Sequence, residues 1–165
     1  MIEVLRLSHR AGRDPRISTH VALVARAFLS SKIYYSGDKD DSFERSVTDV
    51  VKNFGGKFEI EYVKNALKLI KEKRKDKWKI VHLTMYGEKI KKVKGNILIV
   101  VGGEKVPMEI YHEADYNFSV TNQPHSEVGA LAVLLHELND GKELDFRFDG
   151  KIKIKPSKCG KEFEK

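Results

Sequence analysis

Apolar residues recur along most of the chain in two alternating patterns. Short apolar or alternating runs, typical of strands, are separated by longer stretches in which apolar residues share one face of a helix. The predicted strands cover residues 2–7, 32–36, 58–63, 80–85, 97–101 and 116–120. The predicted helices begin at Ser18 or Thr19, at Asp41 or Ser42 (through Asn53), at Asn65 (to about Arg74) and at about Ser126 (to Leu138).

This alternation predicts an α/β fold with a mostly parallel sheet and helices on both faces. The C-terminal part differs, because residues 144–148 and 151–154 flank Asp149 and Gly150, a strong turn signal for a β-hairpin. We therefore expect a main domain over residues 1–141 and a basic β-hairpin tail of the same domain over residues 142–165. The tail suits either phosphate contacts or a sheet edge protected by lysines.

Positive charge is concentrated in one part of the chain. The formal net charge is +7, and residues 64–94 hold twelve Lys or Arg against three acidic residues. That segment is therefore +9, and the rest of the chain sums to −2. A basic stripe on a folded domain is typical of a polyanion partner such as nucleic acid. Lysine-rich helix faces also serve solubility and thermal stability.

Several function classes are disfavoured by missing features. The one cysteine, Cys159, excludes an internal disulfide and a cysteine-based zinc cluster, which fits a reducing cytoplasm. Neither a signal-like segment nor an apolar run of spanning length is present, so we expect a cytoplasmic protein without a membrane partner. The sequence also lacks a P-loop lysine motif, a GxSxG elbow, an HExxH motif and a GxGxxG after a strand.

The sequence also gives little support for a metal site or for catalysis by histidine. The acidic residues Asp38, Asp40 and Asp41 fit no calcium loop and stand where a helix needs a cap, so no metal is expected. The histidines that show no partner pattern, and are expected to be ordinary surface or core residues, are His9, His82, His112 and His136.

Backbone-rich loops follow two predicted strands within residues 97–135, the most informative part of the chain. Gly102 and Gly103 come directly after a buried strand, and glycine lets the main chain approach a ligand closely. Residues 121–126 follow the next strand and supply amide and hydroxyl groups before a helix. Open α/β sheets bind ligands at the carboxyl ends of their strands. We expect a shared pocket for a small polar ligand, although each loop alone also suits a plain strand exit or a helix cap.

Three segments resemble the motifs of the SPOUT class of RNA methyltransferases: residues 19–28 (THVALVARAF), 98–107 and 116–135. More closely, LRLSHRAGRDPRISTHVALVARAF, IVVGGEKVP and NQPHSEVGALAVLL are similar to the archaeal tRNA (cytidine-56) 2′-O-methyltransferase family. The resemblance runs from about residue 2 to residue 138. It implies a C-terminal deep trefoil knot, a homodimer, S-adenosylmethionine (SAM) held in the knot, and tRNA as the partner.

The resemblance also assigns roles to residues. Arg26 becomes the expected catalytic residue, with His20 six positions before it, where many relatives carry Asn. A guanidinium stays protonated in proteins, so we expect Arg26 to clamp a phosphate and stabilise the developing alkoxide. A base titrating near neutrality would instead be His20 or His125. The expected SAM-binding residues are Leu83, Gly102, Gly103, Glu104, Lys105, Val106, Val120, Thr121, Asn122, Gln123, Pro124, His125, Ser126 and Glu127.

Four arginines beside the predicted catalytic helix suit RNA phosphates and unpaired bases. The expected RNA-binding residues are Arg6, Arg10, Arg13 and Arg16. Two alternative functions remain open at this point: a noncatalytic basic RNA-binding module, and an enzyme of the same fold that methylates an RNA base.

Overall fold

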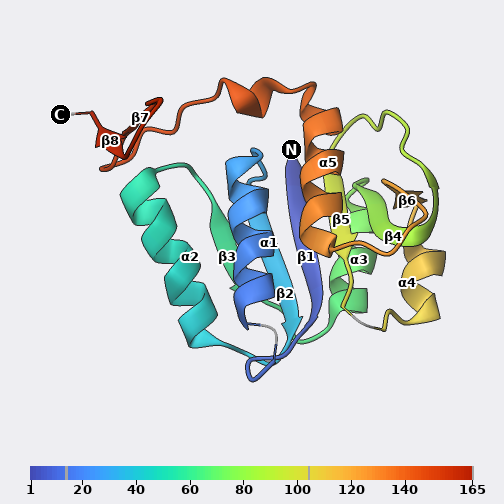
Figure 1. Cartoon of the computed structure of the whole chain (residues 1–165). Helices are drawn as coiled ribbons and strands as arrows, with labels where there is room; N and C mark the ends of the chain where they lie inside the picture. The colour runs from blue at the N-terminus through green and yellow to red at the C-terminus, as the bar shows by residue number, and fades with distance from the viewer. Residues whose placement is uncertain (14, 104, 165) are drawn as a thin grey trace.

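A six-stranded parallel sheet forms the centre of the protein (Figure 1). The computed structural model describes residues 1–13, 15–103 and 105–164. The strands lie in the order β3-β2-β1-β5-β4-β6, and each neighbouring pair is parallel, as the alternating pattern predicts. Their bounds are β1 Ile2–His9, β2 Lys32–Gly37, β3 Glu59–Tyr62, β4 Lys79–Lys89, β5 Ile97–Val101 and β6 Tyr116–Ser119.

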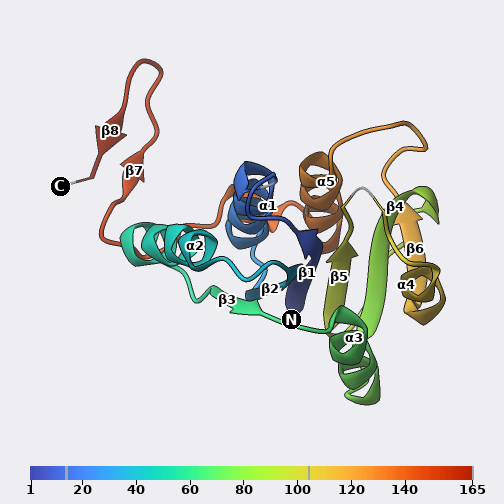
Figure 2. The ribbon, with the colours of Figure 1, turned by 90° about the horizontal axis from the view of Figure 1, so that it is seen from below.

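Helices cover both faces of the sheet, as predicted (Figure 2). On one face, α1 (Pro15–Ala27), α2 (Asp41–Phe54) and α5 (Glu127–Asn139) enclose the larger hydrophobic core. On the other face, α3 (Ala66–Lys75) and α4 (Met108–Glu113) bury Ile70 and Ile110 against β1, β4 and β5. Strand β5 is buried at all five positions, because it lies in the middle of the sheet with both faces covered.

Local capping explains where the helices begin. Ser126 caps α5, accepting a hydrogen bond from the backbone N–H of Val128, close to the predicted start. The predicted caps of two other helices are wrong. Helix α2 is capped by Asp40, which accepts from two backbone N–H groups. Helix α1 begins at Pro15, because proline suits the first helical position, where its missing N–H is not needed.

One helix, α4, was not predicted. It has six residues, begins after Pro107 without a side-chain cap, and buries a single residue, Ile110. Such a short helix has too few turns to produce a clear apolar repeat, so its stability comes from packing on the sheet.

The C-terminal tail, residues 142–164, differs from the predicted hairpin. Residues 144–148 and 151–154 do not pair. The antiparallel pair is instead formed by β7 (Ile154–Lys155) and β8 (Glu162–Phe163), after a 3-10 turn at η1 (Lys142–Leu144). The Asp149–Gly150 turn signal serves another purpose: a Cβ at Gly150 would lie 2.3 Å from the carbonyl carbon of Phe54, at the end of α2. Tertiary contact, and not a two-residue hairpin, therefore explains this glycine.

The second half of the chain takes an unusual path. Strand β5 lies between β1 and β4, and after β6 the chain returns across the sheet to α5, which packs beside α1 (Figures 1 and 2). Asn139 at the end of α5 donates to the carbonyl oxygen of Phe28, just past the end of α1. The two helices are therefore joined at this end by a side-chain bond as well as by apolar packing.

His82 generates a prediction about the pH dependence of stability. Its ring is fully buried on β4, bonded through Nδ1 to Asn117 and edge-on to Tyr111. Burial lowers the pKa of His82 below its ordinary value near 6.5. Between the folded and the unfolded pKa the unfolded chain binds more protons, so stability rises with pH in that window and is fully present above about 6.5.

We expect the free energy of unfolding to fall as the pH drops below about 6.5, with a contribution from this group of up to about 1.4 kcal/mol per pH unit. The variant His82→Leu removes that contribution. Urea unfolding from pH 4.5 to 8 measures it as the difference in slope between the two proteins. Equal slopes would assign the pH dependence to other groups.

Candidate active site

Three predicted cofactor segments meet at the carboxyl edge of the sheet. Leu83 near the bend of β4 is paired with Val101 at the end of β5 and with Phe118 on β6. The segments that leave these strands therefore start side by side. Residues 121–126 are exposed, whereas Leu83 is buried. The structure thus brings Leu83, the β5 exit and the β6 exit together, as the sequence predicts.

A single amide joins two of these segments. Asn122 Nδ2 donates to the carbonyl oxygens of Met85 (2.7 Å) and Gly87 (3.1 Å). The turn after Leu83 is also pressed against β6, because a Cβ at Gly87 would lie 2.5 Å from the carbonyl oxygen of Asn117. The two loops consequently form one unit, whose spacing depends on the Asn122 amide.

A buried arginine joins the third segment to helix α5. Arg6 on β1 is only 2% exposed. Its Nη1 donates to the carbonyl oxygen of Gly102, and its Nη2 lies 3.1 Å from Glu127 Oε1. The β5 exit is tight as well, since a Cβ at Gly102 would lie 2.2 Å from the Val106 side chain. The prediction that Arg6 contacts RNA is therefore wrong for this chain, in which it connects two of the predicted cofactor segments.

The remaining predicted cofactor residues line the surface of these loops. Ser126 is the N-cap of α5, and His125 Nδ1 lies 3.3 Å from the carbonyl oxygen of Ser126. Glu104 lies outside the described residues. The other exposed positions are Lys105, Thr121, Gln123 and Pro124, and the half-buried ones are Val106 and Val120. Within the described residues no group of three or more His, Cys, Asp or Glu side chains could hold a metal ion.

The arginine loop after β1 lies at the same edge of the sheet. Arg13 and Arg16 are exposed and Arg10 is half-buried, so the predicted RNA contacts keep a surface position in these three cases. His9 is buried beneath the loop. Its Nδ1 lies 2.7 Å from Ser18 Oγ.

The other nitrogen of His9, Nε2, lies 3.2 Å from Asp40 Oδ2. A backbone N–H from Phe43, and then the bond to His9, lower the pKa of Asp40. His9 therefore ties the starts of α1 and α2 together, although the sequence showed no partner for it. Because its partners Ser18 and Asp40 lie 9 and 31 positions away, no local motif could have revealed the connection.

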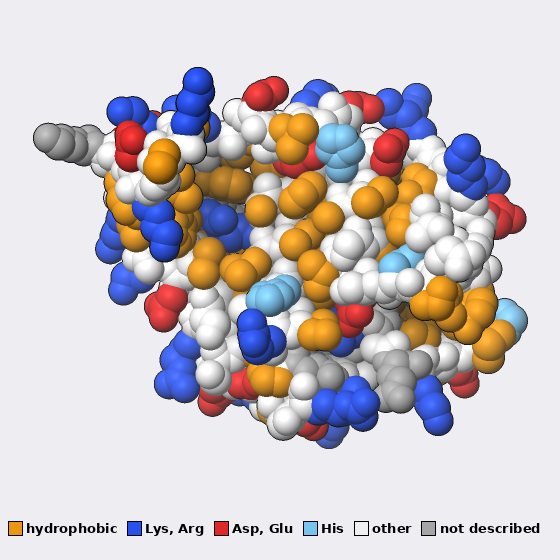
Figure 3. All heavy atoms as spheres, in the orientation of Figure 1, with side chains coloured by type: hydrophobic (Ala, Val, Ile, Leu, Met, Phe, Trp, Pro, Cys, Tyr) orange, Lys and Arg blue, Asp and Glu red, His pale blue; other side chains and the backbone are white. Residues whose placement is uncertain are grey.

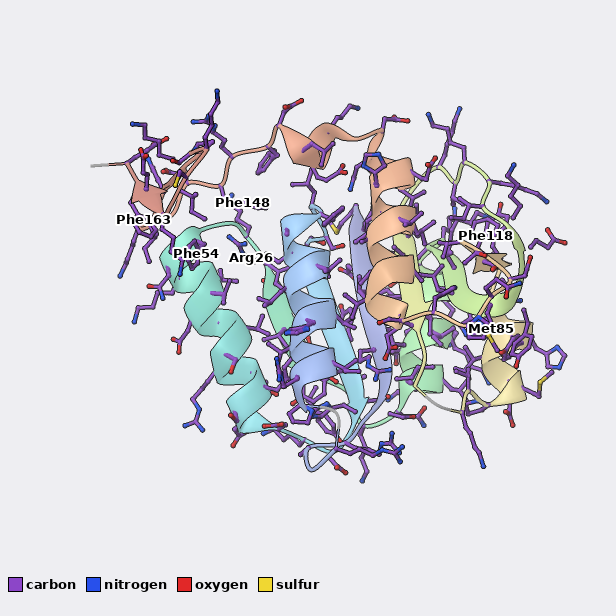
Figure 4. All side chains as sticks on the ribbon, viewed as in Figure 1. Arg26, Phe54, Met85, Phe118, Phe148 and Phe163 are labelled. Carbon is purple, nitrogen blue, oxygen red and sulfur yellow. The ribbon has the colours of Figure 1, made fainter. Side chains whose placement is uncertain are left out.

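The predicted catalytic Arg26 is held at the opposite end of α1 (Figure 4). Its side chain is 7% exposed. Nε donates to the carbonyl oxygen of Gly55 (3.1 Å), and Nη2 donates to the carbonyl oxygens of Phe54 (2.8 Å) and Gly55 (2.6 Å). The guanidinium carbon lies 4.5 Å from the centre of the Phe148 ring.

The electrostatic state of Arg26 follows from this burial. Burial lowers the pKa of the guanidinium from its ordinary value, yet an arginine retains its charge in proteins. Within the described residues, Nη1 makes no hydrogen bond with another protein group. Three N–H groups thus fix the guanidinium on the end of α2, and the Nη1 donors are left for a ligand.

Within one chain, Arg26 is separated from the predicted cofactor loops. Helix α1 runs from the carboxyl edge of the sheet to the amino edge over 13 residues, a length of about 20 Å. His20, exposed on α1, lies six residues before Arg26. The two residues are therefore about 9 Å apart along the helix axis and on different sides of the helix. The structure therefore brings neither His20 nor the cofactor loops next to Arg26 of the same chain.

Comparisons with known proteins identify the family. A model of the tRNA ribose 2′-O-methyltransferase family aTrm56 matches residues 54–164. The tRNA (cytidine(56)-2′-O)-methyltransferase of Methanosphaera stadtmanae is 50% identical to the chain over 170 residues, which cover 98% of this chain and 97% of that protein. The chain belongs to this family. Proteins of the same name from Methanobrevibacter smithii (49% identical, covering 97% and 93%) and Pyrococcus horikoshii (51% identical, covering 98% and 83%) are similar to it over nearly its whole length.

Solved structures show the same fold at low sequence identity. An RNA 2′-O ribose methyltransferase has a TM-score of 0.65 and 16% identity, covering 84% of this chain and 56% of that one. The SpoU methyltransferase AviRb from Streptomyces viridochromogenes, solved with AdoMet, has a TM-score of 0.62 and 12% identity, covering 83% and 56%. These likenesses establish the fold of the family member described here.

The structure adds partners of Arg26 that the sequence did not reveal. The carbonyl oxygens of Phe54 and Gly55 are main-chain groups, which carry no sequence signal. Phe148 lies in a tail that was expected to form a hairpin. Spacing along the chain could not connect these residues to Arg26, because 28 or more positions separate them.

Arg6 generates a prediction about stability. The variant Arg6→Leu leaves Glu127 and the Gly102 carbonyl oxygen without their charged partner. Removing one member of a largely buried ion pair is costly, so we expect the free energy of unfolding to fall by about 3 kcal/mol. Arg16→Leu, at an exposed position, is the matched control and should change it by less than about 0.5 kcal/mol. Chemical denaturation compares the two, and equal stabilities would refute the role of Arg6 as a buried connector.

Proposed function

We propose that this protein transfers the methyl group of SAM to the ribose 2′-hydroxyl of cytidine 56 in tRNA. The observation that carries this proposal is the identity of about one half with tRNA (cytidine(56)-2′-O)-methyltransferases over nearly the full length of both chains. An enzyme explains the geometry better than a binding module does. A module that only holds RNA has no need for a buried guanidinium with donors left over.

The loops at the carboxyl edge suit the donor. Their main chain is exposed over residues 121–126, and Gly102 and Gly103 let a ligand approach the backbone. The fixed contacts of Asn122 and Arg6 keep the loops at a set spacing, which preorganises a binding site. When bound there, SAM supplies an activated methyl group on its sulfonium sulfur.

A deep trefoil knot in the C-terminal part belongs to the same proposal. Its support is the chain path: β5 is inserted between β1 and β4, and the segment after β6 returns across the sheet edge to α5. The loops that make this return are the proposed SAM-binding loops. A knot would tie the ligand site to the most constrained part of the chain.

A homodimer is proposed because, within one chain, Arg26 and the proposed SAM-binding loops lie at opposite edges of the sheet. Apolar side chains form a band over α1 and α5 (Figure 3). In this band Val133 is 46% exposed and Ile17 is 42% exposed. Two copies can meet face to face through these helices about a two-fold axis perpendicular to the helix axes. The amino edge of one sheet then lies against the carboxyl edge of the other. Arg26 of each chain then faces the SAM loops of its partner.

In the proposed reaction Arg26 acts by charge and position. A ribose hydroxyl is a weak nucleophile, and the alkoxide charge that develops during transfer needs stabilisation. The Nη1 donors can contact that oxygen or the adjacent phosphate, while the other N–H groups keep the guanidinium fixed on α2. The hydroxyl proton leaves to phosphate or water. His20 and His125 are both exposed, and the structure gives neither a contact with Arg26.

The arginines that follow β1 are the proposed tRNA contacts. Arg10 and Arg13 lie in the loop after β1, which is anchored by His9, and Arg16 lies in the first turn of α1. Helix α3 adds a lysine-rich surface on the other face of the sheet. A cytoplasmic location is part of the proposal, because tRNA is the substrate. Among the described residues, no helix is long and apolar enough to cross a bilayer.

The role of Asn122 predicts a change in SAM affinity. In Asn122→Asp the two donors are lost and a carboxylate faces the carbonyl oxygens of Met85 and Gly87, so we expect the loops to separate and the Kd for SAM to rise at least tenfold. Asn96→Asp makes the same chemical change at an exposed position before β5, at the opposite edge of the sheet, and should stay within about twofold. Isothermal titration calorimetry gives both values. Similar affinities for the two variants would remove the Asn122 bridge from the SAM site.

The role of Arg26 predicts a loss of turnover. A lysine cannot make three N–H bonds to α2 and still present a second nitrogen, so Arg26→Lys should lower kcat at least 100-fold with the Kd for SAM unchanged. Arg45→Lys, exposed on α2, is the matched control and should retain full activity. The assay is methyl transfer from radiolabelled SAM to a tRNA transcript, followed by nucleoside analysis.

Each outcome of that assay distinguishes one function from another. A labelled 2′-O-methylcytidine at position 56 supports the proposal. A methylated base would identify the base-modifying alternative, and tRNA binding without any transfer would identify a binding module. Nearly full turnover by Arg26→Lys would remove the guanidinium from the mechanism.

A further inference from the structure

The C-terminal tail contacts the same helix end that holds Arg26. The backbone N–H of Ile152 donates to the carbonyl oxygen of Asn53 (2.8 Å). A Cβ at Gly56 would lie 2.8 Å from the ring of Phe148, and a Cβ at Gly150 would lie 2.3 Å from the main chain of Phe54. The tail is therefore laid directly on the end of α2, with the close approach made possible by glycines on both sides.

Phe148 completes the surroundings of the guanidinium. The end of α2 provides two carbonyl oxygens as acceptors for Arg26, and the Phe148 ring lies 4.5 Å away. Figure 4 shows Arg26, Phe54 and Phe148 grouped near the ends of α1 and α2, away from Met85 and Phe118. A cation over an aromatic face is attracted by the ring quadrupole, and the attraction is stronger where water is excluded. The half-buried ring therefore favours one orientation of the guanidinium.

A cavity of about 800 Å³ adjoins this arrangement. Arg26 lines it together with tail residues, among them Phe146, Phe148 and Lys153. Its volume falls in the range of sites for small ligands, which includes a single nucleotide. Since Nη1 of Arg26 makes no bond within the described residues, its donors are available to a group that enters from this side.

We infer that Phe148 is a positioning residue for methyl transfer: its ring fixes the Arg26 guanidinium so that Nη1 is presented to the target nucleotide. The inference rests on the proposed function, in which Arg26 is catalytic. It makes the tail a wall of the active site, which differs from the sequence reading of the tail as a basic appendage. A misplaced guanidinium lowers the rate of the chemical step, whereas SAM, bound at the other edge of the sheet, is unaffected.

Three substitutions test the ring. Phe148→Leu retains apolar bulk without a ring quadrupole, and we expect kcat to fall about tenfold with the Kd for SAM unchanged. Phe148→Tyr keeps the aromatic face and should stay within about threefold of the parent. Phe163→Leu removes an exposed aromatic elsewhere in the tail and serves as the matched control. Wild-type kcat in Phe148→Leu, or equal losses in the leucine and tyrosine variants, would overturn the inference.

Chemical rescue separates positioning from a merely structural role. In Arg26→Ala the two carbonyl oxygens and the Phe148 ring remain, so added ethylguanidinium at low millimolar concentration should restore part of the transfer activity. In Arg26→Ala/Phe148→Leu we expect the ethylguanidinium concentration that gives half-maximal rescue to rise about tenfold. Phe148→Met, which fills similar space, replaces the leucine in both experiments if melting curves show that Phe148→Leu does not fold. An equal half-maximal concentration in both backgrounds would contradict the role of the ring.

The failures of the two ideas are distinguishable. If Arg26→Ala alone keeps its activity, then Arg26 is not catalytic, and the proposed function loses its key residue. If Arg26→Ala is inactive but Phe148→Leu is fully active, the proposed function stands and the positioning role of Phe148 falls.

Discussion

The parallel sheet is the constraint on which the rest of the structure depends. When all strands run in one direction, their carboxyl ends share one edge, and each helix that returns to start a new strand ends at the other edge. The proposed SAM-binding loops after β4, β5 and β6 therefore lie together, while the end of α1 with Arg26 lies about 20 Å away. In the proposed homodimer the two are brought together through the exposed apolar band over α1 and α5.

Two buried arginines, one at each edge of the sheet, hold together segments that are separate in the sequence. Arg6 holds the main chain of the β5 exit and the carboxylate of Glu127, and Arg26 holds the last carbonyl oxygens of α2. In both places a planar guanidinium with five donors satisfies several acceptors from separate segments at once. The contacts of Arg26 use three of its donors, and its Nη1 makes no hydrogen bond within the described residues, which is why a catalytic role suits it.

Much of the fold was predictable, because apolar periodicity records burial directly. The six strands of the main sheet, the four longer helices and the gathering of the loops after Leu83, Val101 and Ser119 all follow from it. Arg6 was misread although the signal was present: it alternates with Leu5 and Leu7 on β1, so it had to point toward the face covered by α1 and α5. Helix α4 and the contacts of the tail left no signal, since a six-residue helix has no clear period and a long-range ring contact has no spacing.

The contact between Arg26 and Phe148 joins residues that lie far apart along the chain. A ribosome makes Arg26 more than 120 residues before its aromatic neighbour, and the tail can pack on α2 only after Phe148 has left the exit tunnel. A nascent chain can therefore complete most of its sheet while its arginine is still incompletely held. In the proposed mechanism, a product truncated before Phe148 would therefore retain the proposed donor loops without a fully positioned arginine.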